Sequence, residues 1–230
     1  MVNALKRFAP NWEKGCRIGA ASAIVIMLAA VSALPCRSAG IIATVTDEHG
    51  QPLPDAVVSV ISNAKVQIAP SDRLATATID QHEETFVPTV VVVQRGGSVI
   101  FHNSDHTRHH IYSFSQIRQF EFVQKPDDAS PAVSFDVPGV VAIGCNIHDN
   151  MAAYVYVTDA PRAAVTDSMG RAEITDLPAG DFIATVWHPR LRPKAVPPPQ
   201  PVTLESSNTN LAITIAVLPP RRARNTKSLY

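Results

Sequence analysis

The chain has 230 residues, of which 20 are lysine or arginine and 20 are aspartate or glutamate, so its formal net charge is zero. The charges are unevenly placed, because residues 40–230 hold 15 basic against 19 acidic residues and four of those 15 bases lie in 221–230. The body of the chain is therefore acidic, which excludes the basic surface of a nucleic-acid-binding protein. The length, the 19 prolines and the frequent turn signals predict one or two β domains.

Residues 1–39 have the pattern of an export signal peptide. Four basic residues precede an apolar run over 18–34, and small residues follow it, so we expect cleavage near residue 39. A retained membrane anchor is the alternative, although the run is slightly short for a membrane span. Cleavage leaves one cysteine of three, Cys145, in a periplasmic or secreted protein with no stable membrane span. That thiol has no internal disulfide partner.

The rest of the chain is expected to be all-β. β-branched residues, glycine and proline punctuation and a spacing near ten residues are typical of β-sandwiches. Strands are expected at 41–46, 56–61, 75–80, 89–93, 98–102, 112–114, 133–135, 139–144 and 152–157. Residues 165–187 then show a strand, turn, strand, turn, strand pattern, the proline-rich 190–201 is predicted to be an extended linker, and 211–217 a last strand. The segment 115–123 is ambiguous, and the basic tail 219–230 is expected to be disordered.

The residues that carry chemistry lie in the loop before the strand at 152–157. Cys145, His148 and Met151 are separated by two spacers of two residues, which puts a thiolate, an imidazole and a thioether on one short loop. This donor set suits copper better than other biological metals, and a trigonal site with a weak axial methionine needs one more histidine. His109 and the adjacent His110 are the candidates. Because neighbouring residues of an extended chain point to opposite faces, only one of them can face the metal.

The loop belongs to a set of motifs in the order expected for one family: Phe86-Val-Pro, Gly96-Gly-Ser-Val, Asn103-x-Asp105, His109, Gly139 and Cys145-x₂-His148-x₂-Met151. This set resembles the cupredoxins, the blue copper proteins, with a ligand loop similar to that of amicyanin. The wider context resembles exported cupredoxins of the methylamine-utilisation type. The resemblance covers about residues 75–158 and implies a Greek-key cupredoxin sandwich there. It also implies one type 1 copper ion, bound by His109, Cys145, His148 and Met151.

Two positions depart from the family pattern. The residue after the first ligand is commonly asparagine, which ties the two ligand loops together, and here it is His110, which is also the alternative ligand. The residue before the loop histidine is often proline, and here it is Ile147. Such neighbours tune metal affinity and potential, so they bear on the potential more than on copper binding itself. Asn103 is expected to supply part of the missing tether.

Other chemistries were weighed against copper. Zinc would use four donors: His109, His110, Cys145 and His148. The presence of Met151 and the alternation of strand residues argue against that set. A Cys/His hydrolase is disfavoured because no orienting acid or oxyanion hole is evident in the sequence. A second metal patch would be formed by three scattered histidines, a pattern that usually belongs to surface residues: His82, His102 and His106.

The regions on either side of the copper motifs resemble a second module. The segments beginning at Thr46 and at Val165 look like the opening and closing halves of a transthyretin-like, carboxypeptidase-regulatory-type β-sandwich. This implies a discontinuous sandwich of 40–66 with 159–218, with the copper domain inserted into it, which surface turns tolerate. The alternative is that 40–66 are the first cupredoxin strands and 159–218 a separate appendage. Pairing between the early and late strands would distinguish the two.

The resemblance implies a copper carrier that transfers single electrons and is not an enzyme. In the family the downstream histidine shows a ring edge to solvent within an apolar patch, for which Ile147, Ala152 and Ala153 are candidates. The acidic body favours a redox partner protein with a basic docking surface. Two alternatives stay open: a periplasmic copper-handling or assembly accessory with copper as its cargo, and a non-catalytic β-sandwich interaction module.

Overall fold

The computed structural model describes residues 39–63, 68–69, 71–192, 194–205 and 207–220. The predicted export signal up to residue 38 and the basic tail from residue 221 lie outside these ranges. Within them the all-β prediction is confirmed, since the chain forms sixteen strands in four sheets and one 3-10 turn, η1 (Asp72–Leu74). No helix in these ranges has the length and apolar character of a membrane span.

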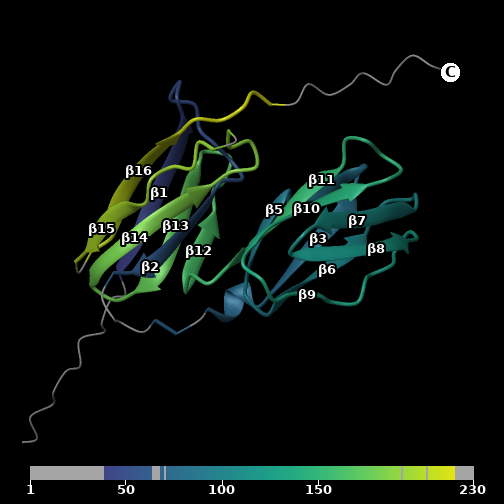
Figure 1. Ribbon diagram of the computed structural model, residues 1–230, viewed down its shortest axis with the longest axis horizontal. Helices are drawn as coiled ribbons and strands as arrows, with labels where there is room; N and C mark the ends of the chain where they lie inside the picture. Colours follow the sequence, from purple (N-terminus) through teal and green to yellow (C-terminus); the bar gives the residue numbers. More distant parts are fainter. Residues whose placement is uncertain (1–38, 64–67, 70, 193, 206, 221–230) are drawn as a thin grey trace, which may run out of the picture. The chain divides into compact units, whose positions relative to one another are not determined.

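One pair of sheets forms from the middle of the chain (Figure 1). The first sheet has the order β4-β3-β6-β9 and the second the order β5-β11-β10-β7-β8. The strands are β3 (Thr76–His82), β4 (Thr85–Val87), β5 (Val90–Gln94), β6 (Gly97–Asn103), β7 (His109–Ser115), β8 (Arg118–Gln124), β9 (Val133–Phe135), β10 (Gly139–Cys145) and β11 (Ala152–Thr158). Their inward side chains form one hydrophobic core, which contains Phe101, Val141 and Ile143 as well as Cys145 and Met151. We call this pair of sheets the loop-site sandwich.

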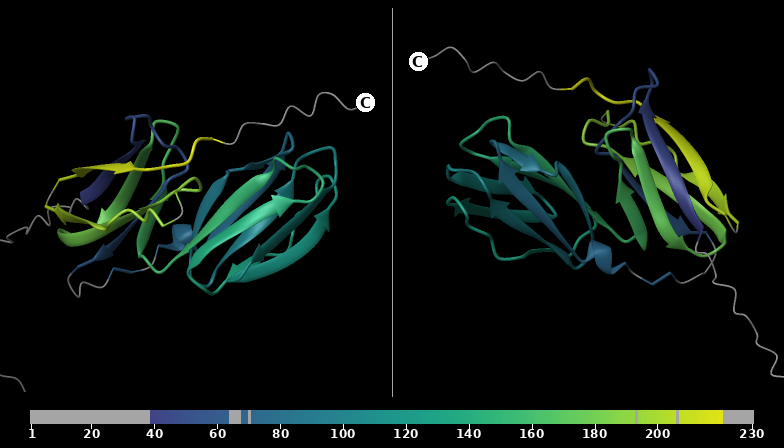
Figure 2. Two further views of the ribbon diagram at one scale, coloured as in Figure 1. Left: turned by 45° about the horizontal axis from the view of Figure 1, so that its top comes forward. Right: turned by 180° about the vertical axis from the view of Figure 1, so that it is seen from behind.

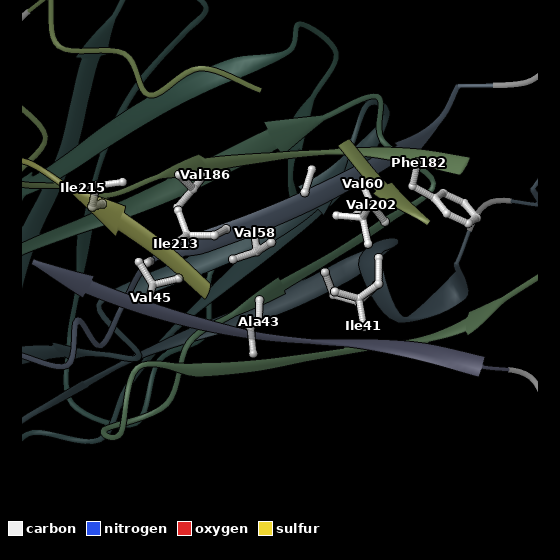
Figure 3. Close-up of a cluster of buried hydrophobic side chains, with 14 of the residues drawn as sticks. Ile41, Ala43, Val45, Val58, Val60, Phe182, Val186, Val202, Ile213 and Ile215 are labelled. Carbon is white, nitrogen blue, oxygen red and sulfur yellow. The ribbon is translucent and has the colours of Figure 1, made fainter. Parts of the chain in front are cut away.

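The second pair of sheets has the orders β13-β1-β16 and β12-β2-β14-β15. Its strands are β1 (Ala39–Asp47), β2 (Val57–Ser62), β12 (Arg162–Val165), β13 (Arg171–Leu177), β14 (Gly180–Trp187), β15 (Gln200–Leu204) and β16 (Thr209–Ile215). Figure 3 shows side chains of its core, including Ile41, Val58, Phe182 and Ile213, gathered between the sheets. We call this pair of sheets the split sandwich.

The split sandwich joins strands from the two ends of the chain. β1 pairs antiparallel with β13 and parallel with β16, where Ile41 aligns with Thr209, so the purple β1 lies beside the yellow β16 in Figure 2. β2 pairs antiparallel with both β12 and β14. The two first strands therefore complete sheets whose other strands follow residue 158.

Two segments differ from their predicted structure. The ambiguous 115–123 spans the end of β7, a turn and most of β8, and its residues alternate between outward and partly buried positions. The proline-rich segment predicted as a linker ends inside a strand, because Gln200 and Pro201 open β15. β15 is the edge strand of its sheet, and an edge tolerates a proline that lacks a hydrogen-bond donor.

Candidate metal centre

The histidine and cysteine candidates lie on neighbouring strands. β7 begins at His109 and β10 ends at Cys145, and the two strands pair antiparallel with Cys145 opposite Ile111 (Figure 1). Strand alternation turns His109 and Cys145 toward the core, where they are 0% and 5% exposed. The end of the sheet therefore presents a thiol and an imidazole to the same interior point.

Three potential ligand atoms converge at this point. The Cys145 Sγ atom lies 3.7 Å from His109 Nδ1 and 3.9 Å from His148 Nδ1, and the two Nδ1 atoms are 3.2 Å apart. The backbone amide of Ile147 also donates to Cys145 Sγ at 3.5 Å. In the described part of the chain this is the only group of three or more His, Cys, Asp or Glu side chains whose ligand atoms lie within 4.8 Å of one another.

Met151 lies directly before β11 and is 3% exposed. Its backbone amide donates to the carbonyl oxygen of His148 at 3.1 Å, which closes the loop after the second histidine. Its side chain belongs to the same buried cluster as Cys145. The sequence-predicted thioether is thus buried in the core that holds the thiol.

His110 is directed away from the group. Its Nε2 atom lies 2.7 Å from Glu121 Oε1, and its Nδ1 atom lies 3.4 Å from the side-chain nitrogen of Asn146. The backbone amide of Asn146 also donates to the carbonyl oxygen of His110 at 2.9 Å. The two ligand loops are therefore joined by a direct His110–Asn146 contact, which the sequence pattern did not reveal.

Asn103 is fully buried, but it supports its own loop instead of linking the two loops. Its side-chain amide donates to the carbonyl oxygens of Thr107 and Gln124, and its Oδ1 atom accepts the backbone amide of Asp105. The tether expected of Asn103 is thus made elsewhere, because its side chain is held by the 103–107 loop and by β8. Asn103 is therefore bonded to the backbone of Asp105.

The contact between Asp105 and His109 is the most important one that the sequence did not predict. Its Oδ2 atom lies 2.8 Å from His109 Nε2, and its carboxylate accepts the backbone amides of Glu83 and Glu84. Desolvation by burial raises the pKa of this carboxyl, but the hydrogen bonds from Glu84, His109 and Glu83 outweigh it and hold the pKa below its ordinary value. The spacing of four residues between Asp105 and His109 could have predicted this contact, but the sequence supports the two residues only as parts of a family motif.

His148 also meets a carboxylate at its far nitrogen. Its Nε2 atom lies 3.6 Å from Glu84 Oε1, and the side chain of Glu84 is 61% exposed. Among the residues predicted to form an apolar patch beside His148, Ile147 is 46% exposed and Ala152 is exposed, whereas Ala153 is fully buried. Ala153 therefore cannot belong to an exposed patch, because alternation turns it into the core. A patch of Ile147 and Ala152 stays a prediction.

The other histidines named from the sequence do not join the group. His102 Nδ1 contacts Asp80 Oδ1 at 3.1 Å and the Ser104 hydroxyl at 3.0 Å. His82 ends β3, and both His82 and His106 are exposed. The sequence-based argument that no acid orients a histidine beside Cys145 was wrong, because Asp105 contacts His109, which in turn contacts Cys145.

Comparison with known proteins gave a structural likeness only. No family model matches the sequence, and no curated protein matches it. Among solved structures, a purple cupredoxin from Nitrosopumilus maritimus is 20% identical over an alignment that covers 36% of this chain and 99% of that chain, with a TM-score of 0.32. Amicyanin from Paracoccus versutus is 18% identical over 44% of this chain and 98% of that chain, with a TM-score of 0.34.

Proposed function

We propose that this protein is an exported type 1 copper protein that carries single electrons between redox partners. The observation that supports it is the convergence of one thiol sulfur and two imidazole Nδ1 atoms, all within 3.9 Å of one another, on the end of a β-sandwich. Met151 adds a buried thioether in the same core. Two histidines, a cysteine and a weak methionine are the donors of electron-transfer copper sites.

The donor set fits copper better than zinc. A zinc site of four strong donors would need His110, whose two ring nitrogens face Glu121 and Asn146 instead. Soft sulfur donors favour copper(I), and imidazole suits copper(II), so a mixed set serves both oxidation states. We therefore propose that His109, Cys145 and His148 would hold the copper as strong ligands and that Met151 would add a weak thioether donor.

Within this proposal each residue has a definite task. Bound copper supplies a one-electron change between its two oxidation states. Cys145 and His109 are held by paired strands, and the Ile147 amide hydrogen bond steadies the sulfur. Ligands that move little between the two oxidation states keep the reorganisation energy of electron transfer low. Cys145 binds as the thiolate, and metal binding expels its proton.

A hydrolytic role is less well supported, although Asp105, His109 and Cys145 are arranged in the order of a catalytic triad. His109 is 0% and Cys145 is 5% exposed, so little of either residue is open to a carbonyl substrate. A second imidazole also lies near the sulfur, since His148 Nδ1 is 3.9 Å from it. A metal explains both imidazoles, whereas a hydrolase needs only one.

The same proposal extends to the partner and the compartment. The side chain of His148 is 20% exposed, and its exposed surface would offer a short path between the site and a docked protein. The acidic body favours a partner with a basic docking surface. The export signal pattern in residues 1–39 favours the periplasm or secretion.

We also propose that the loop-site sandwich, about residues 75–158, is inserted into a discontinuous domain of 40–66 with 159–218. The pairing of β1 with β13 and β16, and of β2 with β12 and β14, supports this division. Insertion is tolerated where the flanking chain ends lie at surface turns.

Visible spectroscopy of the purified protein after addition of copper(II) tests the proposal. We expect an intense blue or green thiolate-to-copper band that disappears on reduction with ascorbate and returns on reoxidation. The Cys145→Ser variant is the control, because it should lose the band while it keeps the fold. A colourless protein that binds only copper(I) would favour copper handling, and a protein that takes up no copper would favour an interaction module.

A further inference from the structure

The turn between β3 and β4 is held in an unusual backbone conformation. Glu83 and Glu84 both have positive φ, at 51° and 54°, a region that residues other than glycine seldom adopt. Both of their backbone amides point at one carboxylate, since Glu83 donates to Asp105 Oδ1 at 2.6 Å and Glu84 donates to Asp105 Oδ2 at 3.0 Å. The conformation of the turn and the position of Asp105 therefore depend on each other.

The same carboxylate contacts the buried imidazole of the candidate metal centre. Asp105 Oδ2 lies 2.8 Å from His109 Nε2, and the two side chains are 11% and 0% exposed. An ionised carboxylate only accepts hydrogen bonds, so the proton of the neutral imidazole lies on Nε2. The lone pair of His109 Nδ1 is then free and faces Cys145.

The turn also reaches the second imidazole. The Glu84 side chain approaches His148 Nε2 to 3.6 Å, while the backbone of the same residue is bound by Asp105. One turn thus connects to the far nitrogen of both rings, through Asp105 on one side and through Glu84 on the other. The Glu84 contact is longer and more exposed, so it is the weaker of the two.

We propose that Asp105 and the Glu83–Glu84 turn form a clamp that orients the two imidazoles toward Cys145 before any metal is bound. Asp105 and Glu84 are positioning residues in this arrangement, because each acts on the site only through a histidine. The part of the proposal that concerns copper rests on the proposed function, whereas the part that concerns ring orientation does not. Outer groups that hold a ligand histidine in this way fix its tautomer and raise its affinity for metal.

The chain contains a matched control for Asp105. Asp80 also accepts two backbone amides, from Gln81 at 2.9 Å and from Ser104 at 3.2 Å, and it also contacts a histidine, His102. His102 lies outside the converging group. A substitution of Asp80 therefore removes the same kind of hydrogen-bond hub from the same sandwich without touching the clamp.

The first experiment compares Asp105→Asn with Asp80→Asn in the full protein. Copper affinity is measured by competition with a chelator, and the thiolate-to-copper band is recorded for each variant. We expect Asp105→Asn to lower the affinity by about 10- to 100-fold and to shift the band, and Asp80→Asn to leave both unchanged. Equal losses in the two variants, or an unchanged affinity in Asp105→Asn, would overturn the clamp.

The second experiment uses a turn variant that keeps the backbone and removes the Glu84 carboxylate. Glu83→Asn with Glu84→Gly is the sequence that positive φ at both turn positions prefers, so the amides that Asp105 binds are retained. Nitrogen-detected NMR of the metal-free protein, at a pH where the imidazoles are neutral, reports which ring nitrogen carries the proton. We expect His109 to keep its proton on Nε2 in the wild type and in this variant, and His148 alone to lose its fixed orientation.

The NMR measurement separates two kinds of failure. If the wild-type protein binds no copper but His109 shows the Nε2–H form, the proposed function is wrong and the clamp stands. If copper is bound with the expected band but His109 carries its proton on Nδ1 in the metal-free protein, the clamp is wrong and the proposed function stands.

Discussion

Each of the two sandwiches is a pair of β-sheets with a buried histidine, but the histidine has different partners in each. In the split sandwich, His188 is 4% exposed, its Nε2 atom donates to the carbonyl oxygen of Pro54 at 3.0 Å, and its Nδ1 atom accepts the backbone amide of Arg190 at 3.0 Å. In the loop-site sandwich, His109 Nε2 contacts the Asp105 carboxylate, and its Nδ1 atom contacts a thiol and a second imidazole. Both nitrogens of His188 thus bond to backbone, whereas those of His109 meet only side chains, and this second arrangement is the one that the proposed copper site requires.

The two sandwiches also differ in how their buried polar side chains are bonded. In the split sandwich, the buried Ser59, Thr166 and His188 each bond to a separate partner. The loop-site sandwich buries Gln81, Asn103 and Gln124. These three side chains are linked, since Gln81 donates to Gln124 and Asn103 donates to the Gln124 carbonyl oxygen. Buried polar groups are costly unless they are paired, so this network marks the sandwich whose loops must be held in one conformation.

The largest effects are expected from truncating one core phenylalanine in each sandwich. Phe101→Ala and Phe182→Ala should each lower the free energy of unfolding by about 3–5 kcal/mol, because both rings are almost fully buried. Phe101 packs against Phe120 and Phe122 in the loop-site sandwich, so only its truncation should also weaken copper binding. Urea unfolding and copper titration of both variants check this. A loss of copper affinity in Phe182→Ala as large as that in Phe101→Ala would show that the comparison between the sandwiches is wrong.

The next largest effect on the free energy of unfolding is expected from alanine substitutions at two glycines, one in each sandwich. Gly170 has a φ of +72°, and an added Cβ atom would meet the carbonyl oxygen of Val45, so Gly170→Ala should cost about 1–3 kcal/mol in the split sandwich. At Gly144 an added Cβ atom would lie 2.8 Å from the ring of Tyr112, which is a side chain that can move, so Gly144→Ala should cost less. Because Gly144 precedes Cys145, only Gly144→Ala should shift the thiolate-to-copper band. The comparison fails if Gly170→Ala shifts the band or if Gly144→Ala is the more destabilising variant.

The alternation of strand residues accounts for what the sequence predicted about this region. It predicts that the two adjacent histidines face opposite ways, and the structure agrees, since His109 is buried and His110 contacts Glu121. It also explains the error at Ala153, which follows the exposed Ala152 and must point inward. Local spacing therefore shows which side chains share a face, but it does not show what lies opposite them.

Apart from the local contact between Asp105 and His109, the contacts that the sequence did not predict depend on tertiary pairing. Asp105 reaches the turn at Glu83 because β3 and β6 run parallel with Gln81 opposite Asn103, a register that no local pattern reveals. The same holds for His110 and Asn146, which lie 36 residues apart and meet only because β7 and β10 are neighbours. The pairing of β1 with β13, and of β2 with β14, likewise joins segments more than 100 residues apart, and no local pattern predicts it.

A smaller effect on stability is expected from replacing Met151, the buried methionine of the candidate metal centre. Met151→Leu conserves volume and apolar character, so the free energy of unfolding should change by less than about 1.5 kcal/mol. The reduction potential should rise, because a hydrocarbon offers no lone pair to the more electron-poor copper(II). Voltammetry of the variant and the wild type checks this, and Met169→Leu, at an exposed methionine of the split sandwich, is the control. An unchanged potential in Met151→Leu would remove Met151 from the ligand set.

The smallest expected effect is a difference in the acid sensitivity of the two sandwiches. Burial lowers the pKa of His188 below its ordinary value of 6.5, an effect that its hydrogen bond to Pro54 opposes and the charge of Arg190 reinforces. The unfolded chain therefore binds a proton below pH 6.5 while the folded chain does not, and stability falls as the pH drops below that value. In the loop-site sandwich, burial raises the pKa of Asp80, but its hydrogen bonds to Ser104, His102 and Gln81 hold it below 3.8. The stability that ionised Asp80 contributes to the folded state is fully present above pH 3.8. It is lost only as the pH falls toward the lower pKa of Asp80 in the folded protein.

Mild acid should therefore weaken the split sandwich first and strong acid the loop-site sandwich. Thermal unfolding of the metal-free protein between pH 7 and pH 3 measures this, with residue-resolved hydrogen exchange to assign each transition. His188→Gln removes the titrating group, so it should flatten the loss of stability just below pH 6.5 while Asp80→Asn leaves that part of the curve as it is. If the loop-site sandwich instead unfolded first in mild acid, it would be the less stable of the two sandwiches under these conditions. The idea that its buried polar network holds the loops in one conformation would then have to be abandoned.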